Sequence, residues 1–244
     1  QLYDNNTKLK PEELEKLAHR AEQAALKING ISKSQSTSAF YGEQNIHLRA
    51  TNGFSGGYKK SHSGVFCSVI SGDDVEMERD GFGDARTHRS DLISPEEIGK
   101  TAGERAVKKL NSRKPKTGNF PVLFDERISN SLIGHLLSAI NGRAIVQGAS
   151  WASELLGKPI FPKGTSLVED PQRVRSYGSR PFDGEGLPTL KRTIIKDGHL
   201  NEWTLDLATA RQLDATSTAN ASRGVSSPPT PSTSNVILNK GESS

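Results

Sequence analysis

The chain contains little sulfur and few aromatic residues. Its 244 residues include one cysteine, one methionine, two tryptophans and four tyrosines. The single thiol, Cys67, excludes an intramolecular disulfide framework and any multi-thiolate zinc or iron–sulfur site built from this chain alone. We therefore expect the protein to work in the reducing cytoplasm.

Long apolar runs and a strong charge imbalance are also absent. No segment approaches the ~18 consecutive apolar residues of a membrane span, and the opening residues QLYDNNTKLK lack a positively charged region followed by an apolar core. The 32 basic residues exceed the 28 acidic ones by only +4, although the pI is 9.1. We therefore expect no membrane contact, and nucleic acid is not favoured as a partner.

The remaining composition is that of a folded protein. Hydrophobic residues make up 33 % of the chain and charged residues 25 %, with a mean hydropathy of −0.58. At about 150 residues per domain, this length predicts one large domain or two modest ones. The chain begins at Gln1 and ends shortly after an apolar segment, so we expect it to be part of a longer polypeptide.

The first half predicts an α+β unit. The segment KPEELEKLAHRAEQAALKI has apolar residues at helical spacing, with Pro11 suited to the first helical position. From about Thr37 to Phe82, short runs broken by Gly and Asn predict an antiparallel β meander. Ser94 opens a capping box that predicts a second helix. The expected fold class is therefore α+β, a meander flanked by helices.

A linker is predicted between the halves. The segment NSRKPKTGN is basic and broken by Pro115 and Gly118, so we predict domains over 1–118 and 119–244. The second domain is expected to be a mixed α/β segment. The run FPVLF predicts a short buried strand, and Asp125 is suited to cap a helix that ends at Asn141-Gly142.

Three further elements are expected in the second domain. A short helix is predicted around residues 151–156. The dipeptide Asp197-Gly198 predicts a type I′ turn between two strands, because it tolerates positive φ. The Ser-, Thr- and Pro-rich stretch from 216 to 235 suits either a flexible segment or an extended one laid along a groove.

Recognisable catalytic motifs are scarce. No two histidines have the spacing of helical metal ligands, the sequence around Ser150 lacks the second glycine of a nucleophile elbow, and no phosphate-binding loop is present. In FDGEG, Asp183 and Glu185 suit a general acid/base pair, a divalent-ion corner or simply a solvated turn.

A long motif nevertheless resembles a known family. The run SRPFDGEGLPTLKRTIIKDGHLNEWTLDLATARQLDATSTANA resembles the C-terminal domain of the PmbA/TldD family, the modulators of DNA gyrase. LIGHLLSAINGRAI, SWASELLGKPIFP and SLVEDP, together with EQAAL and VEMERDG, resemble its PmbA (TldE) branch. Family members are roughly twice this length, so the resemblance implies a middle domain and the start of the C-terminal domain.

The resemblance implies a chain without zinc. TldD-type subunits carry a helical HExxxH zinc motif, completed by a downstream cysteine, whereas TldE-type subunits pair with them and lack these ligands. Here the corresponding helix reads HLLSAI: His135 stands at the first ligand position, Leu136 replaces the glutamate and Ile140 the second histidine. Leucine cannot activate water and isoleucine cannot bind zinc. We expect no catalytic or metal-binding residue in this chain and zinc in the partner subunit.

The expected function is that of a non-metal subunit in a TldD/TldE-type metalloprotease. Its expected partners are a TldD-type zinc metallopeptidase and unfolded or peptide substrates, with a homodimer as the alternative in isolation. Substrate binding is predicted at Asp183, Glu185, Asp197, Gly198, Pro228, Pro229 and Pro231. Two alternatives stay open at this point: an independent metal-dependent hydrolase using the two FDGEG carboxylates, and a modulator of DNA gyrase acting through protein or DNA binding.

Overall fold

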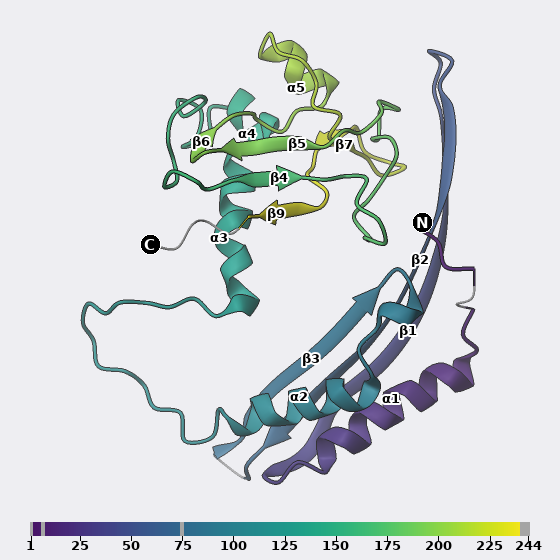
Figure 1. Ribbon diagram of the computed structural model, residues 1–244, viewed down its shortest axis with the longest axis vertical. Helices are drawn as coiled ribbons and strands as arrows, with labels where there is room; N and C mark the ends of the chain where they lie inside the picture. The colour runs from purple at the N-terminus through teal and green to yellow at the C-terminus, as the bar shows by residue number, and fades with distance from the viewer. Residues whose placement is uncertain (1, 6–7, 74–75, 240–244) are drawn as a thin grey trace. The chain divides into compact units, whose positions relative to one another are not determined.

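The computed structural model describes residues 2–5, 8–73 and 76–239 (Figure 1). Contacts divide the chain into two units. The first consists of residues 1–45, 59–119 and 175–177, and the second of 46–58, 120–174 and 178–244. The long hairpin of the first half is thus shared, because its distal end, residues 46–58, belongs by contact to the second unit.

The first unit is a three-stranded sheet with two helices. Its elements are α1 (Pro11–Leu26), β1 (Ile31–Arg49), β2 (Ser55–Ser71), β3 (Glu78–Arg86), the 3-10 turn η2 (Arg89–Asp91) and α2 (Pro95–Val107). The strand order is β1-β2-β3, and β2 pairs antiparallel with β3. The predicted helices and meander are confirmed. The first strand begins earlier than expected, because its polar run from Ile31 lacks the alternation that marks a strand.

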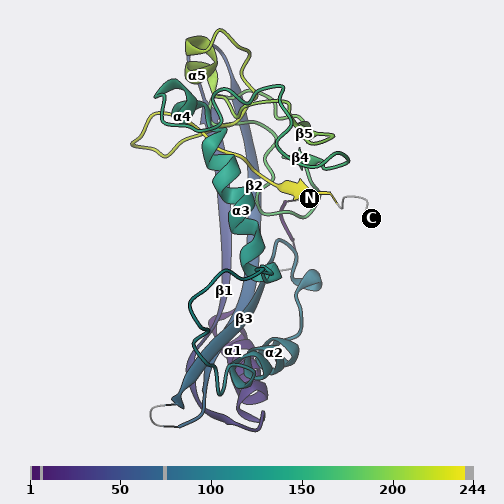
Figure 2. The ribbon, with the colours of Figure 1, turned by 90° about the vertical axis from the view of Figure 1, so that its left-hand side faces the viewer.

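Small residues bring the two helices together. Figures 1 and 2 show α1 and α2 side by side against the sheet. Ser94 caps α2 as predicted, its Oγ accepting the N–H of Glu97 at 3.2 Å. A Cβ on Gly99 would lie 1.9 Å from the carbonyl oxygen of Ala21, so only glycine allows this approach. The buried core consists of Ala21, Ala25, Val65, Cys67, Val69, Ile98, Ala102 and Ala106.

The second unit contains a four-stranded antiparallel sheet and a small two-stranded one. Its elements are α3 (Glu126–Ala139), α4 (Gly142–Val146), β4 (Leu167–Glu169), β5 (Arg192–Lys196), β6 (His199–Leu200), α5 (Leu207–Gln212), β7 (Ala221–Ser222), β8 (Thr230–Pro231) and β9 (Val236–Leu238). The sheet orders are β6-β5-β4-β9 and β7-β8. The end of α3 packs on the larger sheet through Leu136, Ala139 and Ile140.

The predicted hairpin is confirmed. Lys196 pairs with His199, and the two turn residues, Asp197 and Gly198, have φ values of 48° and 82°. The predicted cap of α3 is also present, because the Asp125 carboxylate accepts the N–H of Arg127 at 3.0 Å. Local turn and capping chemistry was therefore sufficient to locate these elements.

Several expectations for the second unit are wrong. Residues 120–124 form no strand, and Leu123 is 97 % exposed: no strand in the described ranges pairs with this apolar run. Residues 151–156 form turns instead of a helix. The predicted end of α3 at Asn141-Gly142 is confirmed, since the helix stops at Ala139; Asn141 in addition caps α4 by accepting the N–H of Arg143 at 3.0 Å. The N-terminal half of α3 leaves Ile128 exposed, so only part of its apolar face is buried.

None of the helices among the described residues combines the length and the apolar character needed to cross a bilayer. The segment between α2 and α3, which includes the basic run near Lys114, is exposed and has no regular structure. The predicted boundary at 118 falls within this segment and stays a prediction.

Two glycine-to-alanine substitutions test the helix contact. Gly99→Ala forces a methyl group against the backbone of α1, so we expect a loss of about 1–3 kcal/mol in unfolding free energy. Gly134→Ala is the matched control on α3, where nothing lies within 4 Å of the new Cβ, and a gain of about 0.5–1 kcal/mol is expected. Urea denaturation followed by circular dichroism measures both. Equal effects would contradict the close approach of α1 and α2.

Candidate functional site

A buried ion pair organises the second unit. Glu169 on β4 accepts from Arg192 Nε on β5 at 2.7 Å, and both side chains are buried. The same carboxylate accepts from Asn220 Nδ2 at 3.0 and 3.1 Å and from the N–H of Ser234 at 2.5 Å. Arg192 Nη2 donates to Thr204 Oγ1 at 2.8 Å. Charge-assisted hydrogen bonds thus join both strands to the segments that precede β7 and β9.

Asp183 fixes the FDGEG loop from inside. Its side chain is only 2 % exposed. One carboxylate oxygen accepts the N–H groups of Glu185 and Leu187, both at 2.9 Å, and the other accepts the N–H of Ala221 at 3.0 Å. The interpretation of Asp183 as a solvated turn residue is therefore wrong. The carboxylate stabilises the loop and attaches it to β7.

Glu185 makes a separate contact. Its carboxylate accepts the N–H of Leu207, at the start of α5, at 2.9 Å. Burial raises the pKa of Glu185, and the Leu207 N–H partly opposes that effect. The two acidic side chains therefore bind different backbone donors. Across the described residues, no group of three or more His, Cys, Asp or Glu side chains is arranged to hold a metal ion.

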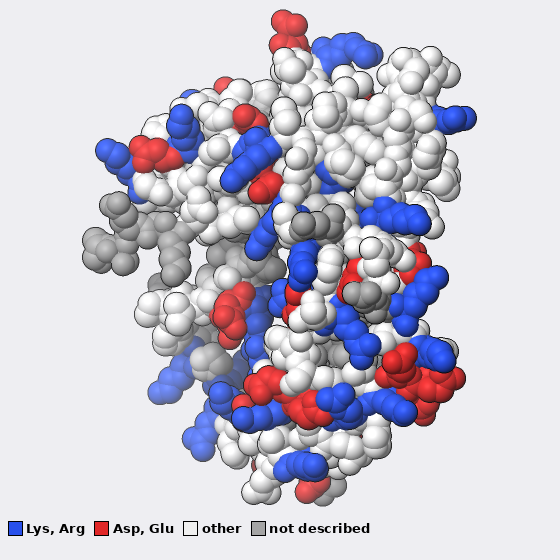
Figure 3. Space-filling model, turned by 45° about the vertical axis from the view of Figure 1, so that its right-hand side comes forward, with Lys and Arg blue, Asp and Glu red and all other residues white. Residues whose placement is uncertain are grey.

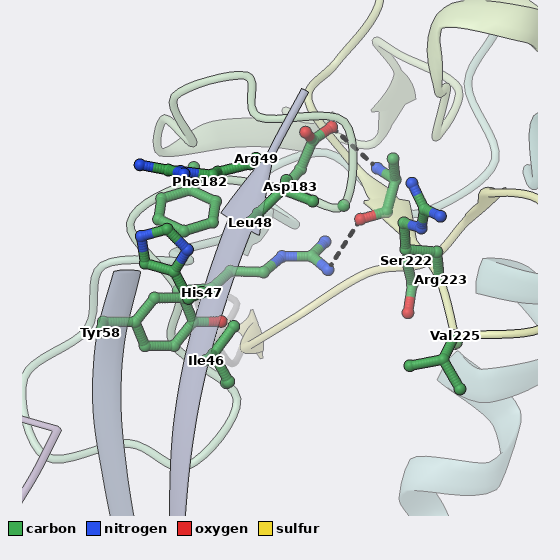
Figure 4. Close-up of a pocket in the computed structure, with 14 residues that line it drawn as sticks. Ile46, His47, Leu48, Arg49, Tyr58, Phe182, Asp183, Ser222, Arg223 and Val225 are labelled. Atoms are coloured by element: carbon green, nitrogen blue, oxygen red, sulfur yellow. Dashed lines mark hydrogen bonds between the residues drawn. The ribbon is translucent and has the colours of Figure 1, made fainter. Parts of the chain in front are cut away.

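Beside Asp183 lies an open cleft of about 550 Å³, which we call the arginine cleft (Figure 4). One wall is formed by residues 46–49 and Tyr58 from the distal hairpin, and the other by Arg180, 182–184 and 221–225. Arg180 donates to the carbonyl oxygens of Ala221 at 3.2 Å and Ser232 at 2.8 Å. The cleft thus combines the fixed guanidinium group of Arg180 with the exposed residues 222–225.

Aromatic rings form the apolar side of this cleft. The ring of Phe182 meets Phe54 and Tyr58 edge to face, with centroids 5.1 and 5.3 Å apart. Burial raises the pKa of Tyr58, and the charge of Arg180 acts in the opposite direction. Tyr58 therefore remains a neutral phenol at physiological pH.

A second, apolar depression of about 980 Å³ lies elsewhere on this unit, and we call it the leucine groove. Leu156, Leu190 and Leu207 expose large parts of their side chains there. Trp203 lines it as well, and Arg192 connects it to the buried network. Such a surface suits apolar side chains of a ligand.

The structure separates the predicted substrate residues. Asp183 lies at the arginine cleft, whereas Asp197 lies in the hairpin turn and accepts the N–H of Gly164 at 2.6 Å. Gly198 has no free backbone group, since its N–H donates to Thr165 and its carbonyl accepts from residues 160 and 161. It cannot pair with a peptide strand without losing these bonds.

The three prolines predicted to bind substrate differ in their exposure to solvent. Pro228 is exposed and Pro229 half-buried, in the loop between β7 and β8. Pro231 is buried in β8 opposite Ala221, and its carbonyl accepts from Asn141 Nδ2 at 2.8 Å. The extended alternative for the stretch 216–235 is confirmed at β7 and β8. Sequence reasoning missed Arg49, Arg180 and Arg223; the only local signal was that Arg180 precedes the FDGEG motif.

Comparison with known proteins decides the family. A profile of the PmbA/TldA metallopeptidase central domain matches residues 4–110, and one of the PmbA/TldA metallopeptidase C-terminal domain matches residues 117–244. The chain belongs to this family. It is 34 % identical over 212 residues to the metalloprotease PmbA of Escherichia coli O157:H7, covering 86 % of this chain and 47 % of that protein.

Solved structures show the same fold. A candidate modulator of DNA gyrase from Bacteroides thetaiotaomicron matches with a TM-score of 0.87 at 26 % identity, covering 99 % of this chain and 53 % of that one. TldE from Thermococcus kodakarensis matches with a TM-score of 0.80 at 18 % identity, covering 96 % and 53 %. The chain thus spans about half the length of the relatives it matches.

The zinc that the family name implies does not fit the corresponding helix. Leu136 and Ile140 are 4 % and 0 % exposed and belong to the hydrophobic core. His135, at the first ligand position, lies on the exposed side of α3. The only thiol, Cys67, is buried in β2 of the first unit, where burial raises its pKa. A thiol that stays protonated is a poor metal ligand.

The role of Asp183 can be tested by its removal. Asp183→Ala leaves the buried N–H of Ala221 and the partly buried N–H groups of Glu185 and Leu187 without an acceptor, so we expect a loss of about 2–4 kcal/mol in unfolding free energy. Glu185→Gln is the control, because the amide oxygen can still accept from Leu207 and the change should stay within about 0.5 kcal/mol near pH 5. Chemical denaturation measures both variants. An Asp183→Ala variant with an unchanged unfolding free energy would contradict the attachment of the FDGEG loop through this carboxylate.

The raised pKa of Glu185 predicts a pH dependence of stability. Because the folded-state pKa lies above the usual 4.5, this carboxyl contributes stability below that value and loses it as pH rises through the folded pKa. The stability of Glu185→Gln relative to the unmodified protein should therefore rise with pH across this window. Denaturation curves at a series of pH values measure the difference. A difference that falls with pH would show that the hydrogen bond from Leu207 outweighs burial.

Proposed function

We propose that the chain is the non-metal, TldE/PmbA-type subunit of a two-component metalloprotease. In this proposal it binds unfolded or peptide substrates and shapes their access, while a TldD-type partner carries zinc in a heterodimer. The observation that supports it best is the replacement of the zinc motif by the core residues Leu136 and Ile140 on α3. The single unpaired Cys67 supports a cytoplasmic location.

The physical reason lies in the cost of burial. A zinc peptidase needs two imidazoles on the metal and a carboxylate that activates water, all of them open to solvent or substrate. Leu136 packs in one cluster with Leu167 and Ile194, and Ile140 is fully buried there. A charged or metal-bound group in those positions would be removed from water without partners. The helix is therefore suited to support the sheet.

The two depressions of the second unit suit the binding role. Their volumes, about 550 and 980 Å³, lie in the range of ligand pockets. The arginine cleft offers the fixed guanidinium group of Arg180 and aromatic rings, and the leucine groove offers exposed leucines. Asp183 and Pro231 support the walls from behind, whereas Pro228 and Pro229 remain predicted contacts on an exposed loop.

The two alternatives have less support. An independent hydrolase would need free carboxylates, but both oxygens of Asp183 already accept backbone N–H groups. The description as a gyrase modulator belongs to the Bacteroides relative. On the face shown in Figure 3, Lys and Arg are interspersed with Asp and Glu, which is unlike the basic track of a DNA-binding protein.

Reconstitution tests the proposal. The full-length protein is purified alone and together with an HExxxH-bearing partner from the same organism, and cleavage of an unfolded peptide is measured with zinc content. We expect the protein alone to hold well under one zinc per chain and to cleave nothing, and the pair to cleave faster than the partner alone. Chelator-sensitive cleavage by the protein alone would overturn the proposal, as would a partner that works equally well without it.

A further inference from the structure

The arginine cleft has an excess of positive charge that the chain does not neutralise. Arg49, Arg180 and Arg223 line it. Figure 4 shows Arg49 and His47 beside Phe182, and Arg223 on the other side of the cleft next to Ser222. Within the described ranges, none of these three arginines forms an ion pair with a carboxylate. Unpaired guanidinium groups gathered around one cavity attract an anion.

The one acidic residue in the lining is already occupied. Both oxygens of Asp183 accept backbone N–H groups, and the side chain is buried behind the cleft wall. Because Asp183 is the only carboxylate against three guanidinium groups, the cleft keeps a net positive charge.

Arg180 is held in place without being neutralised. Its two terminal nitrogens donate to the carbonyl oxygens of Ala221 and Ser232, at 3.2 and 2.8 Å. Carbonyl groups carry no net charge, so they fix the guanidinium plane but leave its positive charge available. The buried Arg180 Nε has no hydrogen-bond partner among the described residues. A cation ordered in advance loses little conformational entropy when a ligand arrives.

Aromatic and aliphatic side chains also line the cleft, next to Arg49 and His47 (Figure 4). Phe182 stacks edge to face with Tyr58, and Ile46 and Leu48 are half-buried beside them. An ion such as phosphate would use only the cationic groups. A ligand that uses both kinds of side chain has an anionic group next to an apolar one, which is a common arrangement in peptides.

We propose that the arginine cleft binds a carboxylate of an extended peptide, either an acidic side chain or the C-terminal carboxylate, with a neighbouring apolar side chain against Phe182 and Tyr58. The planar fork of arginine suits carboxylate geometry. A peptide is favoured over a nucleic acid because the cations surround one cavity and do not form a track. The identification of the peptide as a protease substrate rests on the function proposed above. The positive charge of the cleft is independent of that function.

Binding of labelled peptides to the full-length protein tests this inference by fluorescence anisotropy. Three peptides share one apolar sequence: one has an internal Glu and an amidated end, one a Gln and a free C-terminal carboxylate, and one a Gln and an amidated end. We expect at least one of the two acidic peptides to bind about tenfold more tightly than the neutral one, and which of them does so identifies the source of the carboxylate. Raising NaCl from about 50 to about 300 mM should reduce this preference.

Two exposed arginines allow a variant that should still fold. The double variant Arg49→Gln, Arg223→Gln is expected to bind the preferred acidic peptide about tenfold more weakly. Its affinity for the neutral peptide should be unchanged. Arg143→Gln on α4 is the matched control, since Arg143 is exposed and lies outside the cleft, and it should bind as the unmodified protein does. Thermal denaturation checks that all variants are folded.

The outcomes separate this inference from the proposed function. Equal affinity for acidic and neutral peptides would overturn the carboxylate site, as would unchanged binding in the double variant. Displacement of the acidic peptide by a single-stranded oligonucleotide at a lower concentration than by unlabelled peptide would overturn it in favour of nucleic acid. If acidic peptides bind as expected but the chain does not accelerate cleavage by the partner, the carboxylate site stands and the proposed function fails.

Discussion

The buried pair of Glu169 and Arg192 is the constraint on which the second unit depends. Two charges are removed from water there, which is costly unless hydrogen bonds replace the lost hydration. Asn220 and Ser234 donate to the glutamate, and Thr204 accepts from the arginine. Because every partner belongs to a different segment, the network can be satisfied in only one arrangement of the strands and the loops between them.

This network also builds the arginine cleft. Asn220, which binds Glu169, is followed by Ala221, whose N–H donates to Asp183 and whose carbonyl accepts from Arg180 and from Gly184. One backbone unit thus connects the buried ion pair, the FDGEG loop and the fixed guanidinium. The position of the cation follows from interactions deep in the fold, while its charge remains directed at the cleft.

The sequence was sufficient wherever structure is determined locally. Asp125 caps a helix and Asp197-Gly198 forms a turn through atoms a few residues apart, and both were predicted. The run FPVLF misled because a strand requires a pairing partner, and none of the described strands supplies one. The cleft could not be predicted, since Arg49, Arg180 and Arg223 come from distant segments and no spacing rule joins them.

The packing of helix α3 leaves no position for a metal ligand at residues 136 and 140. Leu136 and Ile140 are buried there in one cluster with the residues of the sheet. A glutamate or histidine introduced alone at either position would bury an unpaired polar group and disturb the packing, at a cost of several kcal/mol, about as much as a domain can lose. The same two positions therefore contribute to stability through their apolar character, and the polar groups of this unit are concentrated in the network of Glu169 and Arg192.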